Sequence, residues 1–218
     1  MSGRPIIIIG SGGHAAVVAD ALLAAGRQVL GFTDNDASRH GARLCGLPVM
    51  GGDSVLGRHS SADVELANGI GGAGKPGSSG LRNRVQRSLE AKGWRFASVR
   101  HPSAVVSPFA QIGAGSQLLA TSVVQAGAVV AEGCIVNTAA VVEHDTRVDA
   151  FVHLACGAVL CGNVTVGANS HIGAGAVIRQ GVQLGEHTVV GAGAVVLNNF
   201  PGGGTLLGVP AVAQKVAA

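Results

Sequence analysis

The segment Ile135–Val148, which reads IVNTAAVVEHDTRV, contains the pattern that decides the fold. Val136, Val142 and Val148 recur at intervals of six residues, and stepping by six from Val106 to Val196 finds an aliphatic residue at all sixteen positions. A small or β-branched side chain stands two residues before each of them, so the pair lies on one face of a strand. A fixed repeat this short predicts a solenoid whose hexapeptides must stack on their neighbours.

The residues before the repeat alternate between strand and helix patterns, which predicts a small parallel sheet covered by helices. The expected elements are strands at 5–10, 28–33, 63–69 and 95–99 and helices at 13–25, 51–59 and 81–92. We therefore expect a Rossmann-like nucleotide-sugar-binding domain at residues 1–100, the solenoid at 101–200 and a C-terminal tail at 201–218.

The composition suits a solenoid, because 35 glycines and only 3% aromatic residues match a chain of small and β-branched side chains. The sequence contains no apolar run of about 18 residues, so no membrane span is expected. The apolar stretch Ile6–Ile9 is too short for an export signal. The four cysteines have no C-x-x-C spacing, so a reducing cytoplasm is expected. The slight positive charge of residues 1–100 suits a phosphate-bearing ligand and is too weak to indicate nucleic acid.

The stretch Gly10–Ala15, GSGGHA, fits the G-x-G-x-x-(G/A) pattern between a strand and a helix. Glycines let the backbone approach a phosphate, and the helix N-terminus offers unpaired N–H groups. Asp34 follows the second strand, where a ribose or base contact is expected. About 100 residues hold only half of a dinucleotide domain, which favours a mononucleotide. A tight turn that binds no ligand remains the alternative.

The stretch Glu143-His144-Asp145 is the strongest candidate for catalysis. Four of the seven charged residues of the repeat region lie within 143–149, and His144 is expected to point outward near a corner. An imidazole beside a carboxylate is suited to accept a proton near neutral pH. An exposed polar corner without a catalytic role is the alternative.

Two further sets of polar side chains have open interpretations. His153 and His171 are eighteen residues apart, so three hexapeptides per coil stack them on an outward face, as a ligand wall or as surface histidines. Arg82, Arg84 and Arg87 lie opposite the apolar stripe of their helix, where they contact phosphates or form a solvated face. No H-x-x-x-x-H occurs, so no metal site is expected.

Several short motifs together resemble one group of enzymes, the hexapeptide-repeat sialic acid O-acetyltransferases and bacillosamine and perosamine N-acetyltransferases. The motifs are Gly-Ser-Gly-Gly-His at 10–14, Asp34-Asn35, His-Pro-Ser-Ala at 101–104, Asn137-Thr138 with Glu143-His144-Asp145, Cys-Gly-Asn-Val at 161–164 and Gly-Val-Pro-Ala at 208–211. The resemblance implies a left-handed parallel β-helix and an enzyme that uses acetyl-CoA as co-substrate.

The resemblance also assigns roles to individual residues of this chain. It implies that His144 is the catalytic base and that Asp145 supports it. It places His153, Gly162 and Ala192 against acetyl-CoA. The residues that it places at the nucleotide sugar or beside the site are Gly12, Gly13, His14, Asp34, Asn35, Gly71 and Asn137.

The function that we expect is acetyl-CoA-dependent N-acetylation of the 4-amino group of a nucleotide-linked 4-amino-6-deoxysugar, such as GDP-perosamine or a UDP-linked relative. A sugar O-acetyltransferase and a non-catalytic nucleotide-sugar-binding solenoid are the alternatives. His144 and His153 are one and a half hexapeptides apart, which places them on opposite sides of one prism. If both serve one site, that site lies between subunits, and the closed arrangement expected is a homotrimer.

Overall fold

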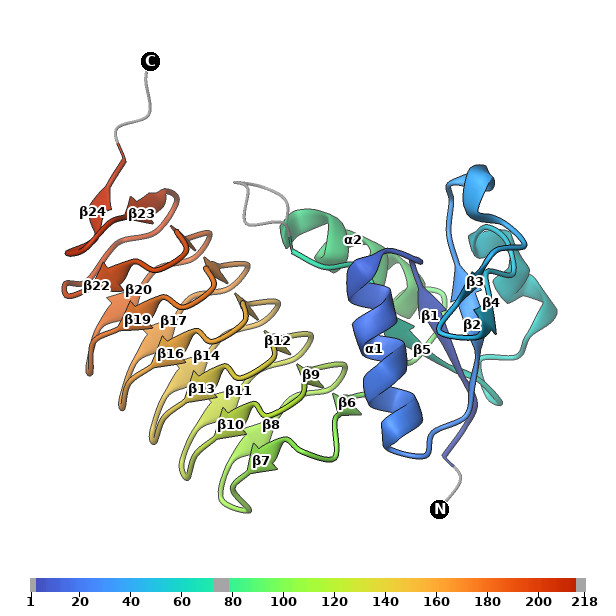
Figure 1. Ribbon diagram of the computed structural model, residues 1–218, viewed down its shortest axis with the longest axis horizontal. Helices are drawn as coiled ribbons and strands as arrows, with labels where there is room; N and C mark the ends of the chain where they lie inside the picture. Colours follow the sequence, from blue (N-terminus) through green and yellow to red (C-terminus); the bar gives the residue numbers. More distant parts are fainter. Residues whose placement is uncertain (1–2, 73–78, 215–218) are drawn as a thin grey trace.

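The computed structural model describes residues 3–72 and 79–214, and it places an N-terminal α/β unit beside a long β-helix (Figure 1). The N-terminal unit has a parallel sheet in the order β2-β1-β5, formed by β1 (Ile6–Ile9), β2 (Val29–Thr33) and β5 (Glu65–Asn68). Its helices are α1 (Gly13–Ala24) and α2 (Ser79–Glu90). The continuous run of isoleucines in β1 is fully buried, as is typical of a central parallel strand.

The N-terminal unit also contains a small hairpin that the sequence analysis did not anticipate. Strands β3 (Arg43–Leu44) and β4 (Leu47–Pro48) pair across Cys45 and Gly46, which both have positive φ. Two such residues form the tight turn that suits a hairpin, but cysteine in this conformation gives no sequence signal. The remaining local helices are short 3-10 turns at Ala37–Arg39 and Asp53–Arg58, the second within the helix expected at 51–59.

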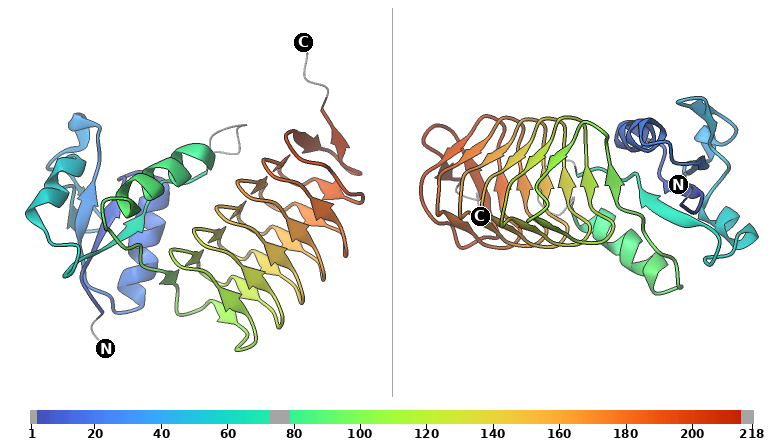
Figure 2. Two further views of the ribbon diagram at one scale, coloured as in Figure 1. Left: turned by 180° about the vertical axis from the view of Figure 1, so that it is seen from behind. Right: turned by 90° about the horizontal axis from the view of Figure 1, so that it is seen from below.

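The hexapeptide pattern produces one two-residue strand per repeat, from β7 to β22. These strands are β7 (Val105–Val106), β8 (Gln111–Ile112), β9 (Gln117–Leu118), β10 (Val123–Val124), β11 (Val129–Val130), β12 (Ile135–Val136), β13 (Val141–Val142), β14 (Arg147–Val148), β15 (His153–Leu154), β16 (Val159–Leu160), β17 (Thr165–Val166), β18 (His171–Ile172), β19 (Val177–Ile178), β20 (Gln183–Leu184), β21 (Val189–Val190) and β22 (Val195–Val196). The second residue of each strand points inward, and the coils stack along one axis (Figure 2).

The three faces of the β-helix differ in the residues that they turn outward. The valine sheet contains β7, β10, β13, β16, β19 and β22, and the polar sheet contains β8, β11, β14, β17 and β20. The covered sheet contains β9, β12, β15, β18 and β21 and is extended at both ends. Its extensions are β6 (Val99–Arg100), β23 (Thr205–Leu207) and β24 (Val212–Ala213).

Both ends of the β-helix differ from the sequence expectation. The strand expected at 95–99 is divided, because Phe96 bridges to Leu66 in the N-terminal unit whereas Val99 pairs with Gln117 in the covered sheet. After the interruption at 198–204, β23 pairs with β21, so the expected tail partly continues the coils. The stacking therefore begins earlier and ends later than the repeat.

The N-terminal unit packs on the covered sheet and leaves the valine and polar sheets free within one chain. Leu119 and Ile135 of the covered face lie in one buried cluster with Ile6, Ile8 and Ala15 of the N-terminal unit. No helix among the described residues is both long enough and apolar enough to cross a bilayer.

The corners of the β-helix use a left-handed backbone conformation at every sixth residue from Gly115 to Gly193. Glycine occupies half of these positions, and the rest are Thr121, Ala139, Asp145, Phe151, Asn163, Asn169 and His187. Asn and Asp tolerate this conformation better than most side chains. The corner position therefore accepts other side chains in place of glycine, at some conformational cost.

Two glycine corners with the same backbone conformation provide a test of what limits this replacement. A Cβ on Gly175 would meet no atom within 4 Å, whereas a Cβ on Gly133 would lie 2.6 Å from the Phe151 ring. Gly175→Ala is expected to lower the free energy of unfolding by about 1 kcal/mol, the conformational cost alone. Gly133→Ala is expected to cost at least twice as much, because the ring must move. Denaturant unfolding of both variants measures this, and equal losses would contradict the account.

Candidate functional site

The glycine turn between β1 and α1 is braced by Asp34 at the end of β2. The Ser11 amide and hydroxyl donate to Asp34 Oδ2 at 2.9 and 2.5 Å, and the Asp36 amide donates to Oδ1 at 2.9 Å. Burial acts to raise the pKa of Asp34, but the Ser11 hydroxyl and these amides outweigh it and hold the pKa below its usual value. Asp34 thus shapes the turn that was expected to hold the ligand.

A cavity of about 600 Å³ opens over this turn. It is lined by six of the seven residues that the resemblance placed at the nucleotide sugar or beside the site, namely Gly12, Gly13, His14, Asp34, Asn35 and Gly71. The seventh, Asn137, lies elsewhere. Gly12 caps α1 without a side chain, so the first N–H groups of the helix remain available to an anion. The cavity therefore fits a phosphate-bearing ligand.

A neighbouring cavity of about 760 Å³ lies between the 3-10 turn Asp53–Arg58 and α2. Its lining shares Asp53, Leu81 and Val85 with the first cavity and adds the basic side chains of Arg84 and Lys92. No motif in the sequence predicts this cavity, because its walls come from segments without a recognisable pattern.

His14 joins the first cavity to the covered sheet. Its Nε2 lies 2.7 Å from Gln117 Oε1, and Gln117 Nε2 donates to the Asn68 carbonyl at 2.6 Å. Burial lowers the pKa of His14 to about 4, the Gln117 bond opposes this, and the charge of Arg82 lowers it further. Gln117 was not among the expected residues, although it occupies the same column as His153, two coils earlier.

His153 and His171 stack on adjacent coils, as the eighteen-residue spacing predicted. The two residues pair in register, and their ring centroids are 4.8 Å apart. His153 is nevertheless buried, because the N-terminal unit covers it with Gly72 and His14. Burial, aided by the charges of His171, His14 and Arg82, lowers the pKa of His153 to about 3. The interpretation of His153 as a surface histidine is therefore wrong, whereas its predicted contact with acetyl-CoA stays a prediction.

His144 and Asp145 stand on the corner between the valine and polar sheets, at the end of β13. His144 Nδ1 lies 2.9 Å from Asp145 Oδ2, and both side chains are more than half exposed. Asp145 adopts the left-handed corner conformation, with a φ of 59°. A Cβ on Gly162, one coil further along, would lie 2.5 Å from His144 Nε2. The imidazole of His144 thus lies directly over Gly162. Only a residue without a side chain leaves room for the ring at that position.

The sequence-predicted residues fall into two groups in one chain. His144, Asp145 and Gly162 lie on the corner between the valine and polar sheets, which is opposite the covered sheet. The nucleotide-sugar candidates lie on the side of the covered sheet, together with His153 and with Asn137 at the end of β12. Ala192, at the end of β21, is exposed on the corner between the covered and valine sheets.

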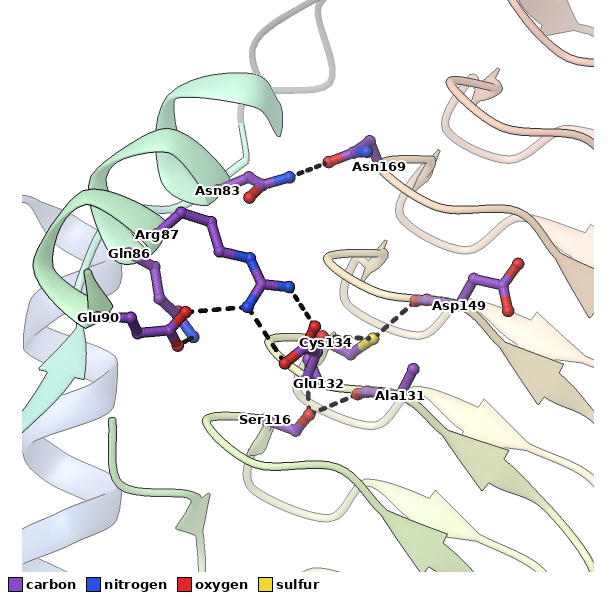
Figure 3. A network of polar contacts seen from close by, with 10 residues as sticks. All are labelled: Asn83, Gln86, Arg87, Glu90, Ser116, Ala131, Glu132, Cys134, Asp149 and Asn169. Carbon is purple, nitrogen blue, oxygen red and sulfur yellow. Dashed lines mark hydrogen bonds and ion pairs between the residues drawn. The ribbon is translucent and has the colours of Figure 1, made fainter. Parts of the chain in front are cut away.

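Two of the three arginines of α2 make contacts that neither interpretation of them foresaw. Arg82 is buried and donates to the Gly133 carbonyl, with its guanidinium 5.8 Å from the centre of the Phe151 ring. Burial lowers its pKa to about 10. Arg87 pairs with Glu132 and Glu90, as Figure 3 shows. These two arginines attach α2 to a corner of the β-helix. Arg87 stays partly exposed, and the exposed Arg84 lines a cavity.

No group of three His, Cys, Asp or Glu side chains within 3–72 and 79–214 is arranged to hold a metal ion. The polar groups described above are instead suited to hydrogen bonding, anion binding and proton transfer.

Two protein families match parts of the chain. The PglD N-terminal domain matches residues 5–75, and the bacterial transferase hexapeptide family, with six repeats, matches residues 163–198. WeeI from Acinetobacter baumannii AYE has a TM-score of 0.86 at 24% identity and supports the fold alone.

Two groups of solved structures resemble the whole chain. The acetyltransferase domain of PglB from Neisseria gonorrhoeae FA1090, in complex with acetyl coenzyme A, has a TM-score of 0.90 at 38% identity over 98% of this chain and 100% of its own. PerB from Caulobacter crescentus, in complex with CoA and GDP-perosamine, has a TM-score of 0.88 at 35% identity over 97% of each chain. The expected fold class, including the left-handed β-helix, is confirmed, and the chain belongs to the acetyl-CoA-dependent hexapeptide-repeat sugar N-acetyltransferases with a PglD N-terminal domain.

Proposed function

We propose that this enzyme transfers acetyl from acetyl-CoA to the 4-amino group of a nucleotide-linked 4-amino-6-deoxysugar, either GDP-perosamine or a UDP-linked relative. The observation that carries the proposal is the exposed His144–Asp145 pair, 2.9 Å apart over Gly162. The cavity at the glycine turn supports a nucleotide-linked substrate. The related PerB structure contains CoA and GDP-perosamine, which supports an amino sugar rather than a hydroxyl acceptor.

His144 is placed to act as the general base. Its Nδ1 donates to Asp145, so the lone pair of the neutral ring lies on Nε2. The sugar amine attacks the thioester carbonyl carbon, and its excess proton passes to Nε2 directly or through water. The C–S bond then breaks, the CoA sulfur takes the proton that Nε2 had accepted, directly or through water, and CoA leaves as a thiol. Backbone N–H groups of the coils hold the oxyanion, and direct transfer needs no acyl-enzyme.

The outward residues of the valine sheet supply an argument for a homotrimer. Each strand of this sheet presents a valine outward, and the members are Val105, Val123, Val141, Val159, Val177 and Val195. The polar sheet presents Gln111, Val129, Arg147, Thr165 and Gln183 instead. An apolar face of this length on a protein surface marks an interface.

The valine sheet lies between the corner that carries His144 and the corner that carries Asn137 and Ala192. If three valine sheets face a threefold axis, each His144 corner meets the Asn137 corner of the next chain. The proposed site then combines His144 of one subunit with Asn137 and His153 of its neighbour. The four unpaired cysteines suit a reducing compartment, and we place the enzyme in the cytoplasm.

A thiol-release assay tests the proposed function. The full chain, with acetyl-CoA, is offered GDP- and UDP-linked 4-amino-6-deoxysugars and the same sugars with a 4-hydroxyl group. We expect CoA release with an amino sugar only, and a product heavier by one acetyl group in mass spectrometry. Release with the hydroxyl sugars alone would replace N-acetylation by O-acetylation, and release with none would refute the proposal.

Removing the imidazole of the proposed base is expected to lower activity strongly. His144→Ala should reduce kcat/KM by roughly 10²- to 10⁴-fold, the usual contribution of a general base. Asp145→Asn should reduce it less, because the ring remains but loses its charged partner. Nucleotide affinity, measured by calorimetry, should be unchanged in both variants. A loss below about threefold for His144→Ala would show that the amine needs no protein base.

The valine sheet can be tested with a matched pair of substitutions on two faces of the same coil. Val159→Glu puts a charge in the centre of the valine sheet, and Thr165→Glu puts the same charge on the polar sheet. We expect Val159→Glu to yield monomers without activity and Thr165→Glu to stay trimeric and active. Light scattering coupled to size-exclusion chromatography measures the mass. A trimeric Val159→Glu protein would place the interface elsewhere.

Mixed trimers test whether one site uses residues from two chains. His144→Ala and His153→Ala proteins are unfolded together at equal amounts and refolded. A site between two chains is intact only when the chain that supplies His144 is the His153→Ala variant and the chain that supplies His153 is the His144→Ala variant. Random assembly gives this order at about a quarter of the interfaces, so about a quarter of the wild-type rate should return. If mass spectrometry shows mixed trimers that remain as inactive as the parents, both histidines belong to one chain.

A further inference from the structure

The orientation of the Asn137 amide is determined by its own turn. The Thr138 amide donates to Asn137 Oδ1 at 2.8 Å, so the amide nitrogen of Asn137 is directed at His153. Asn137 Nδ2 lies 3.3 Å from His153 Nε2. An amide nitrogen can only donate, so Nε2 must carry a lone pair. In a neutral imidazole the single proton then resides on Nδ1.

The surroundings of His153 keep the ring uncharged. The ring is buried, and the groups that face it are His171 from β18, His14 from α1 and Arg82 from α2. None of these is a carboxylate, and together with burial they lower the pKa of His153 to about 3. A neutral ring with its proton on Nδ1 can donate a hydrogen bond but cannot act as a base at that nitrogen.

The Nδ1–H donor lies against Gly72, at the edge of the nucleotide-sugar cavity. A Cβ on Gly72 would lie 2.8 Å from His153 Nδ1, and Gly71 and Gly72 line the cavity. The nearby Gly72 backbone acts to raise the pKa of His153, which partly offsets the effect of burial. It does not, however, form a hydrogen bond of good geometry with Nδ1. Nδ1 is therefore a buried donor that lacks a well-placed acceptor among the described residues.

We infer that Asn137 is a positioning residue that holds His153 as the neutral Nδ1–H tautomer, so that His153 donates a hydrogen bond to a substrate oxygen at the Gly72 edge of the cavity. This rests on the proposed function and assigns Asn137 a role different from a direct substrate contact. The acceptor is an oxygen of either acetyl-CoA or the nucleotide sugar.

Asn137→Asp reverses the tautomer with little change in shape. The new carboxylate can still accept from Thr138, but towards His153 it can only accept, so the neutral ring must place its proton on Nε2. The carboxylate also raises the pKa of His153, and the protonated ring carries a proton on both nitrogens. The variant thus retains the Nδ1–H donor at low pH and loses it as pH rises through the new pKa. Gln111→Glu, exposed on the polar sheet, is the matched control for the added charge.

Nitrogen NMR of the full-length protein reads the tautomer without any need for turnover. The His153 signals are assigned by their loss in His153→Gln. We expect protonated Nδ1 and bare Nε2 in the wild type across neutral pH, and the opposite pattern in Asn137→Asp at high pH. Bare Nδ1 in the wild type would overturn the inference, whether or not the enzyme acetylates the sugars offered.

Steady-state kinetics then test the donor and its acceptor. Relative to wild type, kcat/KM of Asn137→Asp should fall by about tenfold between low and high pH, as expected for one lost hydrogen bond. A higher KM for acetyl-CoA identifies the acceptor on the cofactor, and a higher KM for the nucleotide sugar identifies it on the sugar nucleotide. A pH profile identical to that of Gln111→Glu would refute the role of Asn137.

Discussion

Parallel pairing between residues eighteen positions apart is the constraint on which the rest of the structure depends. Val123 pairs with Val141, and His153 pairs with His171 in the same way. Because consecutive strands of the repeat lie on different faces, each bonds through its backbone to the coil above or below it. Each side chain therefore has a fixed neighbour in the next coil. A large side chain at one position requires a small or complementary one eighteen residues away, as His144 over Gly162 illustrates.

The same columns provide the surface on which the N-terminal unit packs. Helix α2 follows one corner of the β-helix, where Arg82 contacts Gly133 and Phe151. One coil further, Asn83 bonds to Asn169 (Figure 3). Arg82 is buried without a carboxylate partner among the described residues, so a carbonyl oxygen and an aromatic face stabilise its charge. That arrangement ties the cavity at the glycine turn to a rigid scaffold, which is what precise placement of a ligand requires.

The sequence predicts features that depend on near neighbours and on strict repetition. The inward valines, the stacking of His153 on His171 and the outward position of His144 all follow from a period of six and three hexapeptides per coil. The turn at Cys45-Gly46 could not be predicted, because cysteine gives no signal for a left-handed conformation. The burial of Arg82 and His153 could not be predicted either. It arises from packing between segments far apart in the chain, which no local pattern encodes.

Environment divides four of the eight histidines of this chain into two kinds. His14, His153 and His171 lie at or beside the contact between the N-terminal unit and the covered sheet. Burial lowers the pKa of each, so near neutral pH they act as hydrogen-bonding groups. His144 stands on an exposed corner with a carboxylate at 2.9 Å, where its second nitrogen is open to a substrate. The difference follows from the face that each residue occupies, because the N-terminal unit covers only one side of the prism. One scaffold therefore places the buried histidines and His144 on opposite sides of the prism, and the proposed site brings them together only if a second chain contributes.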